Sequence, residues 1–144
     1  MLETIHILNY LLPLLYVAVF AVYLTDFYKD KPALHNIKRI FLFVTLINHT
    51  IYLVLWTIHF DHPPITTKFE IFSVLAFSIG FSYFLIELST DIRATGTFIL
   101  AISIIFQVIS TLFIEDVIDV PEVLKNRLLG LHVISALCGY TGVT

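Results

Sequence analysis

Histidine and aromatic residues recur along one helical face in the second apolar segment of this 144-residue sequence. Thr45, His49, Tyr52, Trp56 and His59 are separated by 4, 3, 4 and 3 residues, which places their side chains on one stripe of an α-helix. An imidazole in such a stripe can bind haem iron or relay protons, so His49, Tyr52 and Trp56 are candidate cofactor-binding residues. The pattern is equally typical of an interhelical hydrogen bond from His49, with Trp56 and His59 at a membrane interface.

A second histidine, His132, begins a series of small residues near the end of the chain. Ser135, Gly139 and Gly142 follow it at spacings of 3, 4 and 3 residues. Small residues on one stripe allow another helix, or a flat macrocycle, to approach the backbone closely. His132 would stand at the mouth of such a groove, while simple helix packing with an interfacial histidine is the alternative, and spacing alone favours that alternative.

Other catalytic and metal-binding patterns do not occur in the sequence. His59, Asp61 and His62 lie beside Pro63 and Pro64, which is typical of a solvated turn and does not predict a dedicated zinc site. The sequence contains no GxSxG, HExxH or P-loop motif, so hydrolytic and phosphoryl-transfer chemistry have no support. A single cysteine excludes an intrachain disulfide.

The composition predicts that lipid surrounds the elements that position these residues. Hydrophobic residues make up 58% of the chain and charged residues only 13%, against roughly 25% in a soluble domain. The mean hydropathy is +0.93. We therefore expect an all-α fold, a single polytopic transmembrane bundle of about five helices over residues 1–144.

Charged residues divide the chain into apolar segments of about the length that a helix needs to cross a bilayer. The predicted spans are 4–25, 40–60, 71–90, 94–114 and 128–144. The last span is short, and we expect it to be the truncated start of a longer helix.

The charges predict the partners and the orientation. A net charge of −3 makes a nucleic-acid partner unexpected. Cytoplasmic loops are richer in Lys and Arg, and counting them predicts an N-terminus outside. One side has five such residues and the other has three: Lys29, Lys31, Lys38, Arg39 and Arg93, against Lys68, Lys125 and Arg127.

Three stretches of the sequence resemble the integral-membrane cytochrome c assembly protein family, of the CcsA/ResC type, with its HemX-like relatives. The first is a membrane histidine followed by Thr, an outer loop with Pro, and Phe-Glu. The second resembles the start of the next helix, and the third a helix that opens with His-Val and closes with Gly-Tyr. They are His49-Thr50-Ile51-Tyr52-Leu53 through His62-Pro63-Pro64 and Phe69-Glu70, then Arg93-Ala94-Thr95-Gly96-Thr97-Phe98, then 131–140.

The resemblance implies a cytochrome c biogenesis factor, or part of a haem-lyase system, that binds haem b transiently at the outer membrane face. It would pass the haem to apocytochrome c together with other assembly subunits, in a bacterial or organellar inner membrane. A residue matching His132 is then an external axial ligand, and one matching His49 lies on the intramembrane haem path. Glu70 matches an acidic position with a structural or substrate-positioning role.

The sequence also departs from the family pattern. Thr67 stands where Asn is usual, and the family's Trp-rich loop and second external histidine are missing from these residues, so another chain or segment would supply the second ligand. Two other functions are compatible with the sequence. One is a small structural subunit of a respiratory or photosynthetic complex that binds no haem in this chain alone; the other is a HemX-like regulator of tetrapyrrole synthesis.

Overall fold

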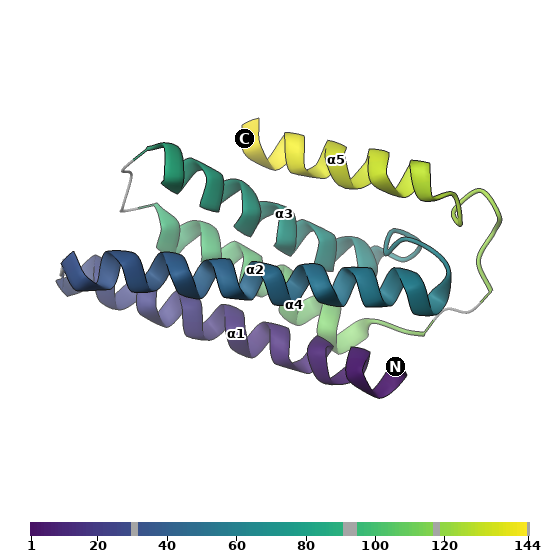
Figure 1. The fold of residues 1–144 in the computed structure, drawn as a ribbon, viewed down its shortest axis with the longest axis horizontal. Helices are drawn as coiled ribbons and strands as arrows, with labels where there is room; N and C mark the ends of the chain where they lie inside the picture. Colours follow the sequence, from purple (N-terminus) through teal and green to yellow (C-terminus); the bar gives the residue numbers. More distant parts are fainter. Residues whose placement is uncertain (30–31, 91–94, 117–118, 144) are drawn as a thin grey trace.

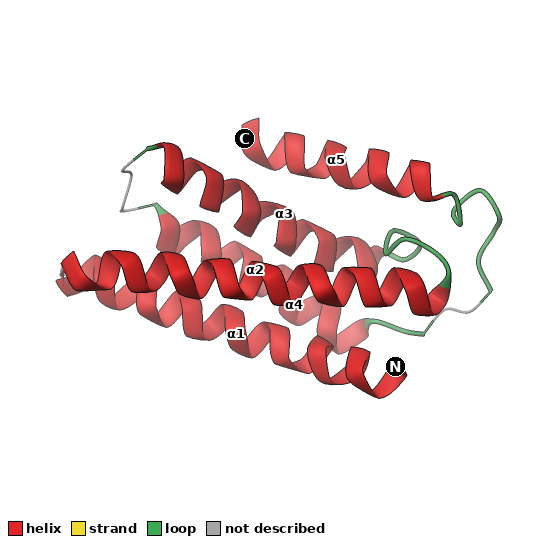
Figure 2. Ribbon diagram, in the orientation of Figure 1, coloured by secondary structure: helices red, strands yellow, loops and turns green. Residues whose placement is uncertain are grey.

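A computed structural model describes residues 1–29, 32–90, 95–116 and 119–143, and within them the fold is all α-helix (Figures 1 and 2). This confirms the predicted all-α polytopic bundle. The helices follow one another up and down along a common axis. They are α1 (Leu2–Lys29), α2 (Pro32–Phe60), α3 (Lys68–Ser89), α4 (Gly96–Phe113) and α5 (Arg127–Val143).

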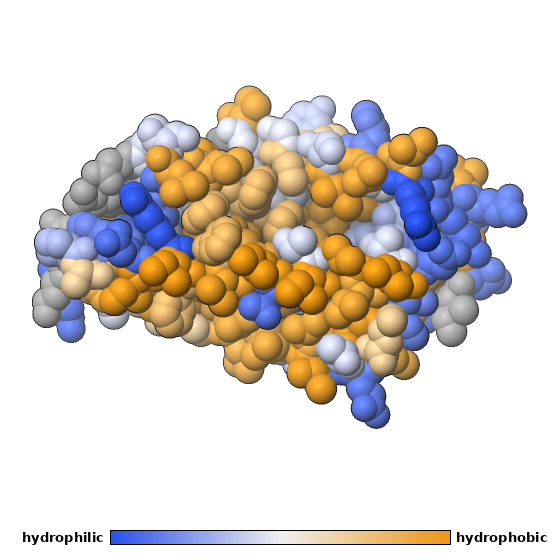
Figure 3. All heavy atoms as spheres, viewed as in Figure 1, coloured by the Kyte–Doolittle hydropathy of each residue, from blue (hydrophilic) through white to orange (hydrophobic). Residues whose placement is uncertain are grey.

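Four of the helices, α1 to α4, are long and apolar enough to cross a membrane, and α5 is a shorter apolar helix. Apolar residues cover the middle of the face in Figure 3, while hydrophilic residues gather towards both ends. A band of this kind is the surface that a bilayer requires, because hydrocarbon offers no partner to polar groups. The chain is an integral membrane protein.

The two ends of the bundle are distinguished by their residues. The proline-loop end holds the N-terminus, the loop 61–67 with Pro63 and Pro64, and the start of α5. The ion-pair end holds the end of α1, the start of α2 and the end of α3, including Asp26, Lys38 and Glu87.

Helices α1 and α2 extend past the charges that bound the predicted spans. Helix α1 continues through Asp26 to Lys29, and α2 begins at Pro32, a residue suited to the first turn of a helix. Helix α3 begins after Thr67, whose side chain caps its N-terminus, in place of the predicted 71. Two predicted span boundaries, Ala94 and Thr144, lie outside the described residues, as do Lys31 and Arg93.

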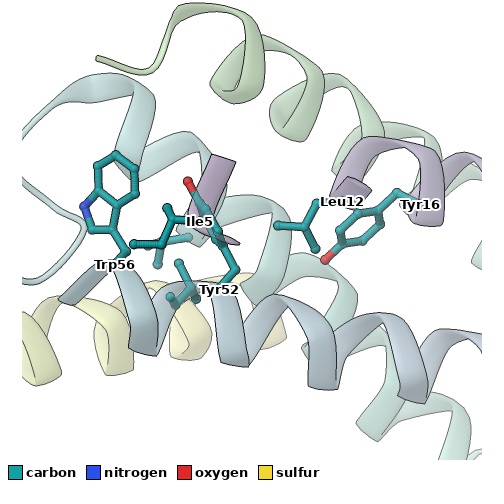
Figure 4. Packing of buried hydrophobic residues seen from close by; sticks show 7 residues of the cluster. Ile5, Leu12, Tyr16, Tyr52 and Trp56 are labelled. Carbon is teal, nitrogen blue, oxygen red and sulfur yellow. The ribbon is translucent and has the colours of Figure 1, made fainter. Parts of the chain in front are cut away.

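The core is formed by α1 to α4, and α5 packs on the outside. Helix α3 packs along α4, and α1 packs along both α2 and α4. Among the other helices, α5 has its contacts with α3, and Gly130 is its one buried residue in the described range. Buried side chains form two clusters, one around Trp56 and Tyr52 (Figure 4) and one around Tyr23 and Leu46.

Gly130 fixes the start of α5 against the loop 61–67. A Cβ atom at Gly130 would overlap the ring of Pro63, whereas a Cβ at Gly139 would meet nothing within 4 Å. We predict that Gly130→Ala lowers the free energy of unfolding by roughly 1–3 kcal/mol, because the helix must move off the loop. Denaturation in SDS–detergent mixtures measures the change. Gly139→Ala is the matched control and should be neutral or stabilising, so equal losses in both variants would contradict the close contact.

Candidate functional site

His49 lies wholly buried at the middle of the bundle, between α1, α2 and α3. Its Nδ1 is 2.9 Å from the hydroxyl of Tyr16, and its Nε2 is 3.0 Å from Oγ of Ser73. Both distances are those of hydrogen bonds, and all three side chains are buried. His49 therefore connects α2 to both α1 and α3.

The hydrogen bonds around His49 run in one direction, which assigns its tautomer. Ser73 donates to Oε1 of Gln107 at 3.3 Å, and the side-chain amide of Gln107 donates to Thr111 at 3.3 Å. Since the Ser73 proton is already used, Ser73 accepts from His49, so Nε2 has the proton. Nδ1 is then the acceptor, and the Tyr16 hydroxyl is its donor. Thr111 donates in turn to the backbone oxygen of Asn9 on α1, at 3.1 Å.

This buried chain of hydrogen bonds joins all four core helices. Each polar group in it has a partner, which is what a low-dielectric interior requires. Neither ring nitrogen of His49 is available to a metal in this arrangement, so a haem iron would have to displace Tyr16 or Ser73. Of the two interpretations of His49, the interhelical hydrogen bond is the one present; its place on a haem path stays a prediction.

Tyr52 and Trp56 continue the stripe of α2 on the buried side, with Thr45, whereas His59 is exposed. Figure 4 shows Tyr52 and Trp56 extending from α2, with Tyr16 from α1 in the same buried layer. The Tyr52 hydroxyl and the Trp56 indole nitrogen have no hydrogen-bond partner among the described residues. Their rings lie 5.9 Å apart, between centroids, so they act here as packing surfaces.

His132 lies on the exposed side of α5, in the same stripe as Ser135, Gly139 and Gly142, which are also exposed. No hydrogen bond or ion pair joins it to any other described residue. Of the two glycines in this stripe, a Cβ at Gly139 would meet nothing within 4 Å, whereas a Cβ at Gly142 would lie 3.8 Å from Oγ of Ser82. His132 and His49 are thus not brought into one site: one imidazole is buried and engaged, and the other is exposed and open.

A groove runs between α2 and α5 on the opposite side of α5 from His132. Its volume is about 360 Å³, and Arg127 stands at its edge. Arg127 pairs there with Asp61 at 3.4 Å, and both side chains are exposed. Apolar side chains and two threonines form the rest of the wall: Thr50, Leu53, Val54, Thr57, Ile58, Pro64, Phe77, Leu131 and Ile134.

Glu70 holds the loop 61–67 against the end of α3. Its buried carboxylate accepts hydrogen bonds from the backbone nitrogen and the hydroxyl of Thr66, at 2.8–2.9 Å. Its own backbone N–H donates to the Thr67 hydroxyl at 3.2 Å. The bond to Thr67 is the N-cap half of a helix capping box, while the carboxylate binds Thr66, the residue before the N-cap. The geometry gives Glu70 a structural role.

A cluster of buried charges at the ion-pair end was not predicted from the sequence. The Lys38 ammonium lies 2.8 Å from Asp26 and 3.3 Å from Glu87, and these three residues are 1%, 5% and 2% exposed. The Tyr23 hydroxyl donates to Glu87 at 2.5 Å, and the Arg39 guanidinium donates to the Glu87 backbone oxygen at 3.3 Å.

The cluster joins α1, α2 and α3 through ionised side chains. Charged residues within membrane helices are costly unless paired, and they are functional candidates by default. In the sequence, only the position of Glu87 pointed to such a cluster: its charge directly follows an apolar run and precedes the polar Ser89 and Thr90.

Known proteins do not indicate the function of this chain, so any functional assignment rests on its own residues. No protein-family model matches the chain, and neither a curated protein nor a solved structure does.

Proposed function

We propose that the chain is a haem-handling membrane protein of the cytochrome c assembly type. It would hold haem b transiently at one membrane face and help to deliver it to apocytochrome c, with other assembly subunits as partners. The sequence stretches that resemble this family support the proposal.

The contact between Gly130 and Pro63 is the main structural support. It brings the loop after α2, in the first stretch of the resemblance, against the residue that directly precedes the third stretch, although the two are far apart in the sequence. Glu70, from the same first stretch, stabilises the loop through Thr66. A rigid junction of this kind would fix the position of His132, which lies in the same first turns of α5.

His132 fits an axial haem ligand better than His49 does. A bound haem would supply an iron atom that accepts an imidazole nitrogen, and a broad apolar face. His132 has an exposed ring, and Gly139 in its stripe leaves open space next to the backbone. His49 lacks a free nitrogen in the present arrangement, so its role would require the loss of a hydrogen bond.

The charge distribution supports the orientation within this proposal. Lys29, Lys38 and Arg39 lie at or next to the ion-pair end, which would then face the cytoplasm of a bacterium or the equivalent side of an organellar inner membrane. The N-terminus, the loop 61–67 and His132 would lie towards the outer face, where cytochrome c is assembled.

We predict that His132→Ala weakens haem binding by the full-length protein by roughly tenfold or more, because an axial ligand is lost. Haem titration in detergent, followed by the intensity and position of the Soret band, measures the affinity. His59→Ala is the matched control, since it removes another exposed imidazole from the same end of the bundle. An unchanged Soret band in His132→Ala would contradict the proposal.

A structural subunit of a larger membrane complex is the second candidate. The saturated hydrogen bonding of His49 favours it, because a histidine that only connects helices needs no cofactor. Co-purification with a large complex at fixed stoichiometry, without haem in this chain, would support this function and exclude the first.

A further inference from the structure

The hydroxyl of the buried Tyr16 faces a neutral base, the imidazole of His49. Its proton points to Nδ1 of His49, as the direction of the hydrogen bonds requires. A phenol gives up an electron far more readily when a base accepts its proton at the same time, and imidazole is such a base. By contrast, the hydroxyls of Tyr52 and Tyr83 have no partner among the described residues. Tyr23 donates to Glu87, whose carboxylate is already paired with Lys38.

A continuous series of aromatic rings leads from this pair to the proline-loop end. The centroid distances are 5.7 Å from Tyr16 to His49, 6.1 Å from His49 to Tyr52, and 5.9 Å from Tyr52 to Trp56. Trp56 lies 4.4 Å from Phe60, which is half-buried at the last residue of α2. An oxidant that touches Phe60 at that end is therefore separated from Trp56 by a single ring. Among these rings, those of tyrosine and tryptophan lose electrons most readily.

We propose that Tyr16 and His49 form a redox site that quenches one-electron oxidants of the membrane, of the class of lipid peroxyl radicals. The radical, at the proline-loop end, takes one electron from Tyr16 through the rings of Tyr52 and Trp56. It also takes one proton from water, which leaves hydroxide, and becomes a hydroperoxide. Tyr16 becomes a neutral phenoxyl radical, and its proton passes to Nδ1 of His49, which becomes an imidazolium. The Nε2 proton stays on the bond to Ser73.

The proposal is tested by photo-oxidation of the full-length protein in lipid vesicles, with a ruthenium tris-bipyridyl sensitiser, persulfate and freeze-trapping for electron paramagnetic resonance. Phe replaces the exposed Tyr10, Tyr28 and Tyr140 in every sample, which removes surface radicals. We expect a tyrosyl signal that is lost in Tyr16→Phe and kept in Tyr83→Phe, the matched buried control. Because the sensitiser supplies the oxidant, the result does not depend on haem binding.

Two further variants test the proton and the path. His49→Asn keeps an acceptor near the position of Nδ1 but cannot take up a proton, so we expect loss of the signal while the fold is kept, as thermal unfolding would show. Trp56→Phe preserves packing and should lower the yield. In vesicles with an azo initiator, the unsubstituted protein should slow oxygen uptake more than Tyr16→Phe does. A full signal in either Tyr16→Phe or His49→Asn, or equal oxygen uptake, would overturn the proposal.

Discussion

Replacing Lys38 by Met is expected to lower the free energy of unfolding by roughly 3–5 kcal/mol, the range for removing one partner of a buried ion pair. The Lys38 ammonium lies between the carboxylates of Asp26 and Glu87, and all three are buried. Without it, two negative charges face each other in a medium of low dielectric. Unfolding in SDS–detergent mixtures, followed by circular dichroism, measures the loss.

The matched control is Lys125→Met, which removes an exposed lysine and should change the free energy by less than about 1 kcal/mol. A further variant that combines Lys38→Met with Asp26→Leu and Glu87→Leu should recover much of the stability, because no buried charge is then left unpaired. If Lys38→Met proved as harmless as the control, the buried cluster would not form in the membrane.

The number and type of the helices could be predicted because lipid imposes a simple rule on the sequence. A helix that crosses hydrocarbon needs about 20 apolar residues; the runs 4–25, 40–60 and 94–114 between charges have that length, and the runs 71–86 and 128–144 are somewhat shorter. The helix ends could not be predicted in the same way. Asp26 and Arg39 bound the predicted spans because an unpaired charge is excluded from hydrocarbon, but the ion pair of Asp26 with Lys38 allows α1 and α2 to extend past them.

The ion cluster itself depends on contacts that no local pattern contains. Lys38 is close to Asp26 through the hairpin of α1 and α2, and it reaches Glu87 only because α3 packs beside them. Residues so far apart in the sequence meet through tertiary packing. A single sequence therefore shows the charges but not their partners.

For the candidate site, the sequence predicted which residues share a helix face but not which residues of other helices they contact. The spacing predicted one stripe of α2 for Thr45, His49, Tyr52, Trp56 and His59. The first four are buried, whereas His59, near the end of the helix, is exposed. The partners of His49 could not be inferred, because Tyr16 and Ser73 lie on other helices. For His132 the spacing gave a stripe of small residues, but which side of α5 would face α3 depends on the contact at Gly130.

Replacing His49 by Leu is expected to lower the free energy of unfolding by about 2–3 kcal/mol, even with no haem present, because buried groups lose their partners. The Tyr16 hydroxyl would keep a buried proton with no acceptor, and Ser73 would lose the donor that joins α3 to α2. The same SDS unfolding assay measures the effect, and His59→Leu, on the exposed side of α2, is the matched control.

A double-mutant cycle separates this connecting role of His49 from a role in ligand binding. When Tyr16→Phe has already removed the buried hydroxyl, His49→Leu leaves no donor unsatisfied, so its further effect should be smaller than in the unsubstituted protein. The difference measures the coupling between the two side chains. Strictly additive losses would mean that the 2.9 Å contact contributes nothing to stability. His49 would then be kept buried for another purpose, and the haem path would become the better explanation of its place in the bundle.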